Sequence, residues 1–287
     1  MNRVKNITAS VRQRLLNISR EKGEDFNLIL VRYSAERLLY RISVSEYAND
    51  FILKGAMLFA AWFSAPYRST RDLDFLARGE PDIAHIQHMF EWFCQQPVQN
   101  DGLRYDPETI RIESIREPNE YGGLRVKMKS FLGPIHIPVQ ADIGFGDVVT
   151  PEEIIIEYPT LIDLPAPRLK SYPPETMIAE KFHAMVFHGI AISRMKDFYD
   201  LYIIRQNRSL NKKHLMKAIQ ATFQRRKTEI PSKLPVALSD KFACDPVKST
   251  QWSSFIERND IRDAPGELTI VIEDLRKFFS QYFSTYK

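Results

Sequence analysis

The sequence predicts an α+β fold: a mixed β-sheet lobe with flanking helices, followed by a C-terminal α-helical lobe. Three observations support this fold class. Apolar residues recur at helical spacing near both ends of the chain. In the middle of the chain, apolar and polar residues alternate as in β-strands. A proline-rich stretch at 151–174 separates the predicted strands from the later helices. We place residues 1–170 in the first lobe and residues 171–287 in the second.

The composition is that of a globular protein without a membrane segment. The chain has 287 residues, of which 44% are hydrophobic and 26% charged. We find no secretory leader and no apolar run approaching the roughly 20 residues of a membrane span. The two cysteines have no motif spacing. We therefore expect a cytoplasmic protein with no membrane partner, and its net charge of +4 permits a polyanionic partner.

The first lobe opens with two predicted helices in residues 9–43. Apolar residues at helical spacing give each helix one hydrophobic face, and Gly23 separates the two. Ser45 stands where a side-chain oxygen would cap a short turn toward Tyr47.

A short strand at 51–53 then runs into a helix at 57–63, with Lys54, Gly55 and Ala56 at the junction. A glycine there lets backbone N–H groups approach a phosphate, and a helix N-terminus favours the negative charge. A simple tight turn is the alternative interpretation.

Two aspartates stand on the next predicted strand, 73–76, in the stretch RSTRDLDFL. Asp72 and Asp74 are two residues apart, so both carboxylates point to the same side of the strand. Like charges this close raise each other's pKa unless a cation lies between them. The pair is therefore either solvated at a surface or holds a divalent cation.

A helix from Pro81 through Phe93 leads to three alternating strands: TIRIESIRE, GLRVKMKSFLG and HIPVQADIGFG. Glycine pairs and a Gly-Pro supply the turns. Asp142 stands late in the third strand, and three carboxylates on neighbouring strands are able to hold two Mg²⁺ ions. Asp147, just beyond, is interpreted as a turn residue. The proline-rich stretch is interpreted as an ordered crossover loop or a hinge.

The second lobe reads as a series of helices. Pro174 is placed to open the first one, and Lys181 falls at the edge of its buried face. Such a lysine either extends its amine to solvent or reaches a bound phosphate. On the next helix Asp197 and Asp200 share a face, either as surface ion pairs worth under about 1 kcal/mol each or as groups that orient Lys181 or a nucleotide.

Basic residues mark two further places. Arg68 and Arg71 flank the aspartate pair, and strand alternation turns Arg71 away, so Arg68 is the better candidate for a phosphate. A later basic group is either a solvated helix face or an RNA contact; its members are Lys212, Lys213, Lys217, Arg225, Arg226 and Lys227. His183, beside Lys181, is the one histidine of interest.

These motifs together resemble a known family. LKGAMLFAAWF followed by RSTRDLDF resembles the nucleotide-binding signature of the DNA polymerase β-type nucleotidyltransferase superfamily. The blocks PPETMIAEKFHAM, RMKDFYDLY and QWSSFIERN narrow the resemblance to the AbiEii/MenT nucleotidyltransferase toxins. The matching blocks span residues 50 to 260, which is most of the chain.

The resemblance implies an enzyme that moves nucleotides from an NTP to the 3′ end of tRNA, releases pyrophosphate and is restrained by a cognate antitoxin. It assigns two Mg²⁺ ions to Asp72, Asp74 and Asp142, and it implies roles in activity for Asp72, Asp74, Lys181 and Asp197. The implied nucleotide-binding residues are Lys54, Gly55, Ala56, Arg68, Thr70 and Lys181.

Two positions depart from the family pattern. The turn reads Gly55-Ala56, where the family has Gly-Ser or Gly-Gly, but the alanine keeps its backbone N–H. Thr70 stands where serine is common and keeps the hydroxyl. Two alternatives stay open: a nucleotidyltransferase that modifies a small molecule or a protein hydroxyl, and a non-catalytic module that binds nucleotide or RNA.

Overall fold

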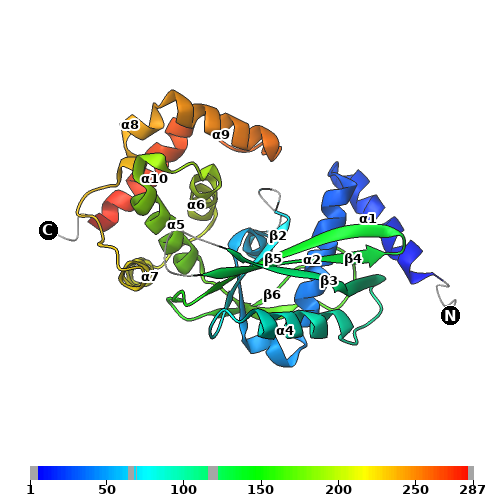
Figure 1. Cartoon of the computed structure of the whole chain (residues 1–287). Coiled ribbons are helices and arrows are strands. Elements are labelled where there is room, and N and C mark those ends of the chain that lie inside the picture. Colours follow the sequence, from blue (N-terminus) through cyan, green and yellow to red (C-terminus); the bar gives the residue numbers. More distant parts are fainter. Residues whose placement is uncertain (1–5, 64–67, 69, 116–121, 284–287) are drawn as a thin grey trace. The chain divides into compact units, whose positions relative to one another are not determined.

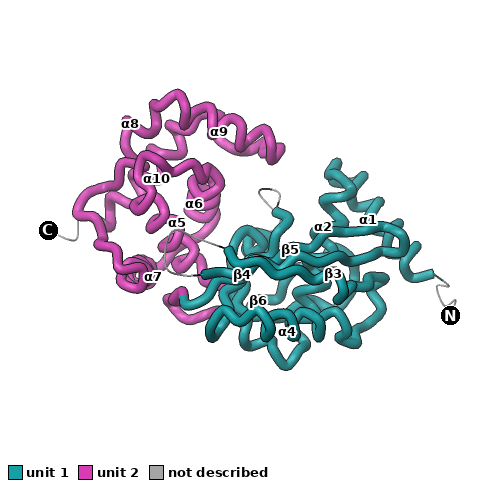
Figure 2. The backbone as a smooth tube through the Cα atoms, viewed as in Figure 1, with its two compact units in different colours: residues 1–146, 154–171 teal, residues 147–153, 172–287 magenta. Residues whose placement is uncertain are grey.

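The computed structural model describes residues 6–63, 68, 70–115 and 122–283. The chain forms two compact units (Figure 2). Unit 1 comprises Met1–Gly146 and Ile154–Ser171, and unit 2 comprises Asp147–Glu153 and Tyr172–Lys287. Within the described ranges, none of the helices combines the length and apolar character that crossing a membrane requires.

Unit 1 begins with the two predicted helices, α1 (Ile7–Lys22) and α2 (Phe26–Ser43). Gly23 ends α1 in the left-handed conformation with φ of 63°, and the Asp25 side chain caps α2 by accepting the N–H of Leu28. Ser45 accepts the Tyr47 N–H, as predicted, at the start of a 3₁₀ turn.

The sheet of unit 1 has seven strands in the order β3-β4-β5-β2-β1-β7-β6, and Figure 1 shows β3, β4 and β5 side by side. It is mixed, because β2 and β5 pair in parallel and so do β1 and β7, whereas the other neighbours are antiparallel. The predicted mixed sheet is thus confirmed. Its strands are β1 (Phe51–Lys54), β2 (Asp72–Ala77), β3 (Leu103–Ile115), β4 (Gly123–Leu132), β5 (Ile135–Phe145), β6 (Ile154–Glu157) and β7 (Arg168–Ser171).

The stretch 151–174 differs from the expectation of a loop, and the boundaries between the two units at Glu153/Ile154 and Ser171/Tyr172 lie within it. It contributes β6 and β7, which form an antiparallel pair at the edge of the sheet. The β-branched run Ile154–Ile156 favours a strand, and the prolines of the stretch stand outside both strands, so no ladder hydrogen bond is lost.

One face of the sheet carries the core. Helix α2 lies on this face, where the Ser34 and Ser130 hydroxyls are 2.7 Å apart and the Tyr105 hydroxyl donates to the Ser34 carbonyl at 2.6 Å. Helix α4 (Ile83–Gln95) covers the same face through Phe90 and Phe93, whose rings contact Phe51 of β1.

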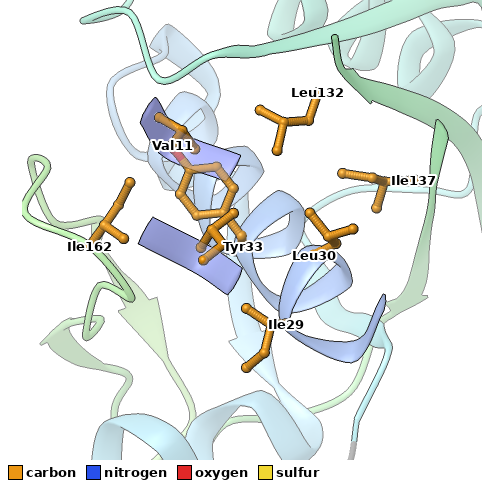
Figure 3. Packing of buried hydrophobic residues seen from close by; sticks show 8 residues of the cluster. Val11, Ile29, Leu30, Tyr33, Leu132, Ile137 and Ile162 are labelled. Atoms are coloured by element: carbon orange, nitrogen blue, oxygen red, sulfur yellow. The ribbon is translucent and has the colours of Figure 1, made fainter. Parts of the chain in front are cut away.

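Part of this core joins the two N-terminal helices to the sheet. Leu30 and Tyr33 of α2 pack with Leu132 and Ile137 of the sheet and with Val11 of α1 (Figure 3). The opposite face of the sheet carries the polar residues of the alternating strands.

Unit 2 is helical, as predicted. Its core includes Phe182, which stacks on Phe279 with ring centroids 4.4 Å apart. Its helices are α5 (Pro174–His188), α6 (Met195–Asn207), α7 (Lys212–Arg225), α8 (Asp240–Ala243), α9 (Pro246–Arg258) and α10 (Leu268–Phe283). Pro174 occupies the first turn of α5, where its missing N–H has no helical partner to lose.

Candidate active site

Strand register brings the three predicted carboxylates to one face of the sheet. Asp74 stands opposite Asp142 of β5, and Asp72 stands opposite Gln140. Residues in register and residues two apart share a face, so Asp72, Asp74 and Asp142 all lie on the face turned away from α2 and α4. Leu73, between the two aspartates, is fully buried on the core side and anchors the strand.

Gly55 lies directly against this acidic face. Its φ is +72°, and a Cβ built on it would lie 2.1 Å from Oδ2 of Asp74. Only glycine adopts this backbone conformation readily and leaves that space empty. Ala56 follows in a 3₁₀ turn, η2 (Gly55–Met57), which leads into α3 (Leu58–Trp62). The backbone of the predicted phosphate loop therefore approaches one of the predicted metal ligands.

Lys54 belongs to the same face. It stands opposite Asp74 in the pairing of β1 with β2. A Cβ on Gly144 of β5 would lie 3.3 Å from Nζ of Lys54, so the lysine extends across β2 toward β5. Gly144 could not be identified from the sequence, because only the strand order shows that it lies beside the Lys54 side chain.

Asp142 is held by Arg125 of β4. The guanidinium donates from Nε to Oδ1 at 2.8 Å and from Nη2 to Oδ2 at 2.6 Å, in the fork geometry of a strong ion pair. The hydrogen bonds that Arg125 donates to Asp142 raise the pKa of the Arg125 guanidinium. Sequence reasoning missed Arg125. Strand alternation along GLRVKMK places Arg125 on the polar face. The register that puts Arg125 opposite Asp142 cannot be derived from the local sequence.

The donor set fits a hard divalent cation in part. Asp72 and Asp74 offer oxygen ligands on one face, and the space beside Asp74 is the one that a Cβ on Gly55 would fill. In the described parts of the chain, no group of three or more His, Cys, Asp or Glu side chains is arranged to hold a metal ion. Both oxygens of Asp142 accept from Arg125, so Asp142 would bind a cation through its remaining lone pairs and share its charge with the guanidinium.

Three further predicted residues stand at the start of β2. The Thr70 hydroxyl donates to the backbone carbonyl of Asp72 at 3.4 Å. Arg68 is half-buried. Arg71 stands directly before β2 and borders the same cavity as Asp72.

The predicted residues of the helical lobe form a separate cluster in unit 2. Nζ of Lys181 lies 2.6 Å from Oδ1 of Asp197 and 2.8 Å from Oδ2 of Asp200. The two carboxylates are 0% and 1% exposed, so the interpretation as solvated surface pairs is wrong. Arg194 adds a second cation, its Nε 2.7 Å from Oδ2 of Asp197. Asp197 and Asp200 thus fix the position of the Lys181 amine.

A second, partly buried network corrects one expectation. Nη2 of Arg226 donates to Oδ1 of Asp147 at 3.1 Å and lies 3.8 Å from Glu180. Asp147 is therefore an ion-pair partner rather than only a turn residue. His183 contacts Arg226 and Thr228. Burial, with Arg226 beside it, lowers the pKa of His183 to about 4, so this imidazole is neutral near pH 7.

The family model "Nucleotidyl transferase AbiEii toxin, Type IV TA system" matches residues 37–280. Among solved structures, JHP933 from Helicobacter pylori matches with a TM-score of 0.51 and 13% identity, over 90% of this chain and 96% of that one. A Helicobacter pylori protein provisionally named a nucleotidyltransferase matches with a TM-score of 0.50 and 13% identity, over 88% and 96%. These two structures support the fold. A comparison with curated proteins gave no match. The chain belongs to the AbiEii nucleotidyl transferase toxin family.

Proposed function

We propose that this family member is a Mg²⁺-dependent toxin that transfers nucleotides from an NTP to the 3′ end of tRNA in the cytoplasm and is restrained by an antitoxin. The observation that carries the proposal is the placement of Gly55 against Asp74. A backbone that only glycine can form lies beside a paired carboxylate, which is what a site for a metal-bound triphosphate requires.

In the reaction, the 3′-hydroxyl oxygen of the acceptor attacks the α-phosphorus of the NTP. A P–O bond forms to the acceptor, the bond from the α-phosphorus to the bridging oxygen of the β-phosphate breaks, and the hydroxyl loses its proton. Pyrophosphate leaves. Mg²⁺ ions bound by Asp72, Asp74 and Asp142 would neutralise phosphate charge and favour the ionised hydroxyl.

The chain's own residues supply positioning and charge. The backbone N–H groups of Gly55 and Ala56, with Lys54, would bind phosphate oxygens. Arg68 and the Thr70 hydroxyl would contribute from the start of β2. Such preorganised contacts account for most of the catalysis in phosphoryl-type transfers.

Lys181 would bind the triphosphate, and Asp197 would position it. Two buried carboxylates hold the Lys181 amine, at 2.6 and 2.8 Å, which fixes its direction before substrate binds. A fixed ammonium loses little entropy when it meets a phosphate.

A labelling experiment tests this function. Purified protein is mixed with total tRNA, Mg²⁺ and each of the four α-labelled NTPs in turn, beside Asp72→Ala and Asp74→Ala. We expect label on tRNA from one or more NTPs with the parent and none with the variants. Label on another RNA, a small molecule or the protein itself would reassign the acceptor, and label transfer that survives both substitutions would refute the proposal.

A further inference from the structure

A cavity of about 740 Å³ lies within unit 1, next to the carboxylate face. It exists because β2 pairs with β5 only from Gln140 onward, which leaves the first residues of β5 beside the start of α2. We call this cavity the β5 groove. Its borders are the N-cap Asp25 with Asn27, Leu28, Leu30 and Val31 of α2, Thr109 and Arg111 of β3, Lys127–Lys129 of β4, His136–Gln140 of β5, and Arg71 with Asp72.

The charged side chains that border the β5 groove are mostly basic. Arg71, Arg111, Lys127 and Lys129 border it, against Asp25 and Asp72 as its acidic side chains. Arg111, Lys127 and Lys129 come from neighbouring strands, since Arg111 stands opposite Lys127 in the pairing of β3 with β4. Three side chains of one sign on one face repel each other in the absence of an anion, so this arrangement favours a polyanionic ligand.

Local contacts hold two of these cations at the groove. Nη1 of Arg111 donates to the carbonyls of Ile110 and Glu108 at 2.7 and 3.0 Å. Nζ of Lys127 contacts both oxygens of Glu113 at 2.8 and 3.0 Å, and the lysine side chain is 46% exposed. Lys129 is exposed at the surface. With Glu113 counted beside Asp25 and Asp72, three carboxylates stand against the four cations Arg71, Arg111, Lys127 and Lys129, which leaves a net charge of +1.

The three aspartates face different neighbours. Asp74 lies against Gly55, Asp142 accepts from Arg125, and Asp72 borders the β5 groove. One end of the acidic pair therefore faces the candidate phosphate loop, and the other faces the basic groove. Two substrates that react with each other are expected to approach the carboxylates from these two directions.

We propose that the β5 groove binds the sugar-phosphate backbone of the RNA strand whose 3′ end is extended, and that it delivers the terminal hydroxyl to Asp72. The inference rests on the proposed transfer to nucleic acid and adds the path of the acceptor. Arg111, Lys127 and Lys129 contact phosphates, which positions the strand without reading its sequence. Such contacts make binding depend strongly on salt.

A pair of double variants tests the groove. Arg111→Gln with Lys129→Gln removes two groove charges and keeps long side chains. The matched control, Lys233→Gln with Lys241→Gln, removes two exposed charges from unit 2. Three quantities are measured for each: the Kd for 5′-labelled tRNA by fluorescence anisotropy over a salt series, the KM for tRNA in label transfer, and the Kd for Mg²⁺-NTP by calorimetry.

The groove variant is expected to raise the Kd and the KM for tRNA at least tenfold. The slope of log Kd against log salt should fall by about 1.5, which corresponds to two lost phosphate contacts. The control should keep its tRNA Kd within twofold, and both variants should keep the NTP affinity and melting temperature of the parent.

Each of the following outcomes would overturn either the groove assignment or the proposed function. An unchanged tRNA Kd in the groove variant, or an equal loss in the control, would overturn the groove assignment while leaving transferase activity intact. A loss of NTP affinity in the groove variant would make the groove the nucleotide site. A parent protein that labels no nucleic acid would refute the proposed function itself, whatever the variants do.

Discussion

The substitution Gly55→Ala tests the placement of the phosphate loop against Asp74. The added Cβ would lie 2.1 Å from Oδ2 of Asp74, whereas ordinary van der Waals contact begins at 3.4 Å. The carboxylate must therefore retreat by about 1.3 Å, or the loop must move by a similar amount. A displacement of about 1 Å at a reacting group lowers the rate roughly 100-fold, which is about 2.7 kcal/mol in activation free energy.

The same substitution also strains the backbone, and a second glycine separates the two effects. Gly79 has φ of +88°, and no described heavy atom lies within 4 Å of a Cβ built on it. Gly55→Ala and Gly79→Ala should each lose about 1–2 kcal/mol of stability from the left-handed conformation. That loss lowers the melting temperature by roughly 2–8 °C in each variant.

The assay compares the two variants by thermal unfolding and by nucleotide transfer. We expect Gly55→Ala to unfold at a temperature equal to or below that of Gly79→Ala, because only its Cβ meets Asp74, and to transfer nucleotide at least 100-fold more slowly. Calorimetry with Mg²⁺-NTP should show the same contrast in affinity. Equal activity in the two alanine variants would refute the reasoning, because the close approach to Asp74 would then have no consequence.

Three further predictions concern charged groups. Arg125→Ala removes the guanidinium that shares the charge of Asp142, so half-maximal transfer should need less Mg²⁺. Stability should change by under about 1 kcal/mol, because the pair is partly exposed. An unchanged Mg²⁺ titration would remove Asp142 from the metal site. Lys181→Met removes the ammonium that the buried carboxylates of Asp197 and Asp200 share, leaves Asp197 with Arg194, and should lower the free energy of unfolding in urea by about 3 kcal/mol. Adding Asp200→Asn should recover part of that loss, and a loss under 1 kcal/mol would contradict the buried pairing. Burial raises the pKa of Glu36 from 4.5 to about 7, so its folded form favours the proton. Protonated Glu36 therefore adds to the free energy of unfolding. This contribution is full below pH 4.5 and falls by on the order of 3 kcal/mol as the pH rises to 7. Glu36→Gln should flatten this dependence of melting temperature on pH, and parallel curves for parent and variant would refute it.

Much of the fold was predictable because its signals are local. Gly23 and Asp25 mark the break between the first two helices, and Pro174 marks the start of α5, since caps and prolines act on neighbouring residues. The strands β6 and β7 were missed, because flanking prolines are typical of loops and a four-residue edge strand gains its stability from the neighbouring sheet.

The residues of the candidate site likewise include some that the local sequence predicts and some that it cannot predict. Asp72 and Asp74 were identifiable because two residues on one strand define their own spacing. Arg125 and Gly144 were not, because their roles depend on which strand lies next to β5 and on its register. The burial of Asp197 could not be predicted from the local sequence either. Charged residues on α6 suggest a solvated face, and only the packing of the surrounding helices buries Asp197.

One measurement tests the central claim most directly, namely that the carboxylate face of unit 1 transfers a nucleotide. The parent, Asp72→Asn and Asp74→Asn are incubated with tRNA and Mg²⁺, once with α-labelled and once with γ-labelled NTP. Asparagine keeps the size of the side chain and removes its charge. Our account predicts that the α-label moves to tRNA, that the γ-label leaves as pyrophosphate, and that both asparagine variants transfer nothing. Transfer of the γ-label to the acceptor, or undiminished α-label transfer by folded asparagine variants, would contradict it.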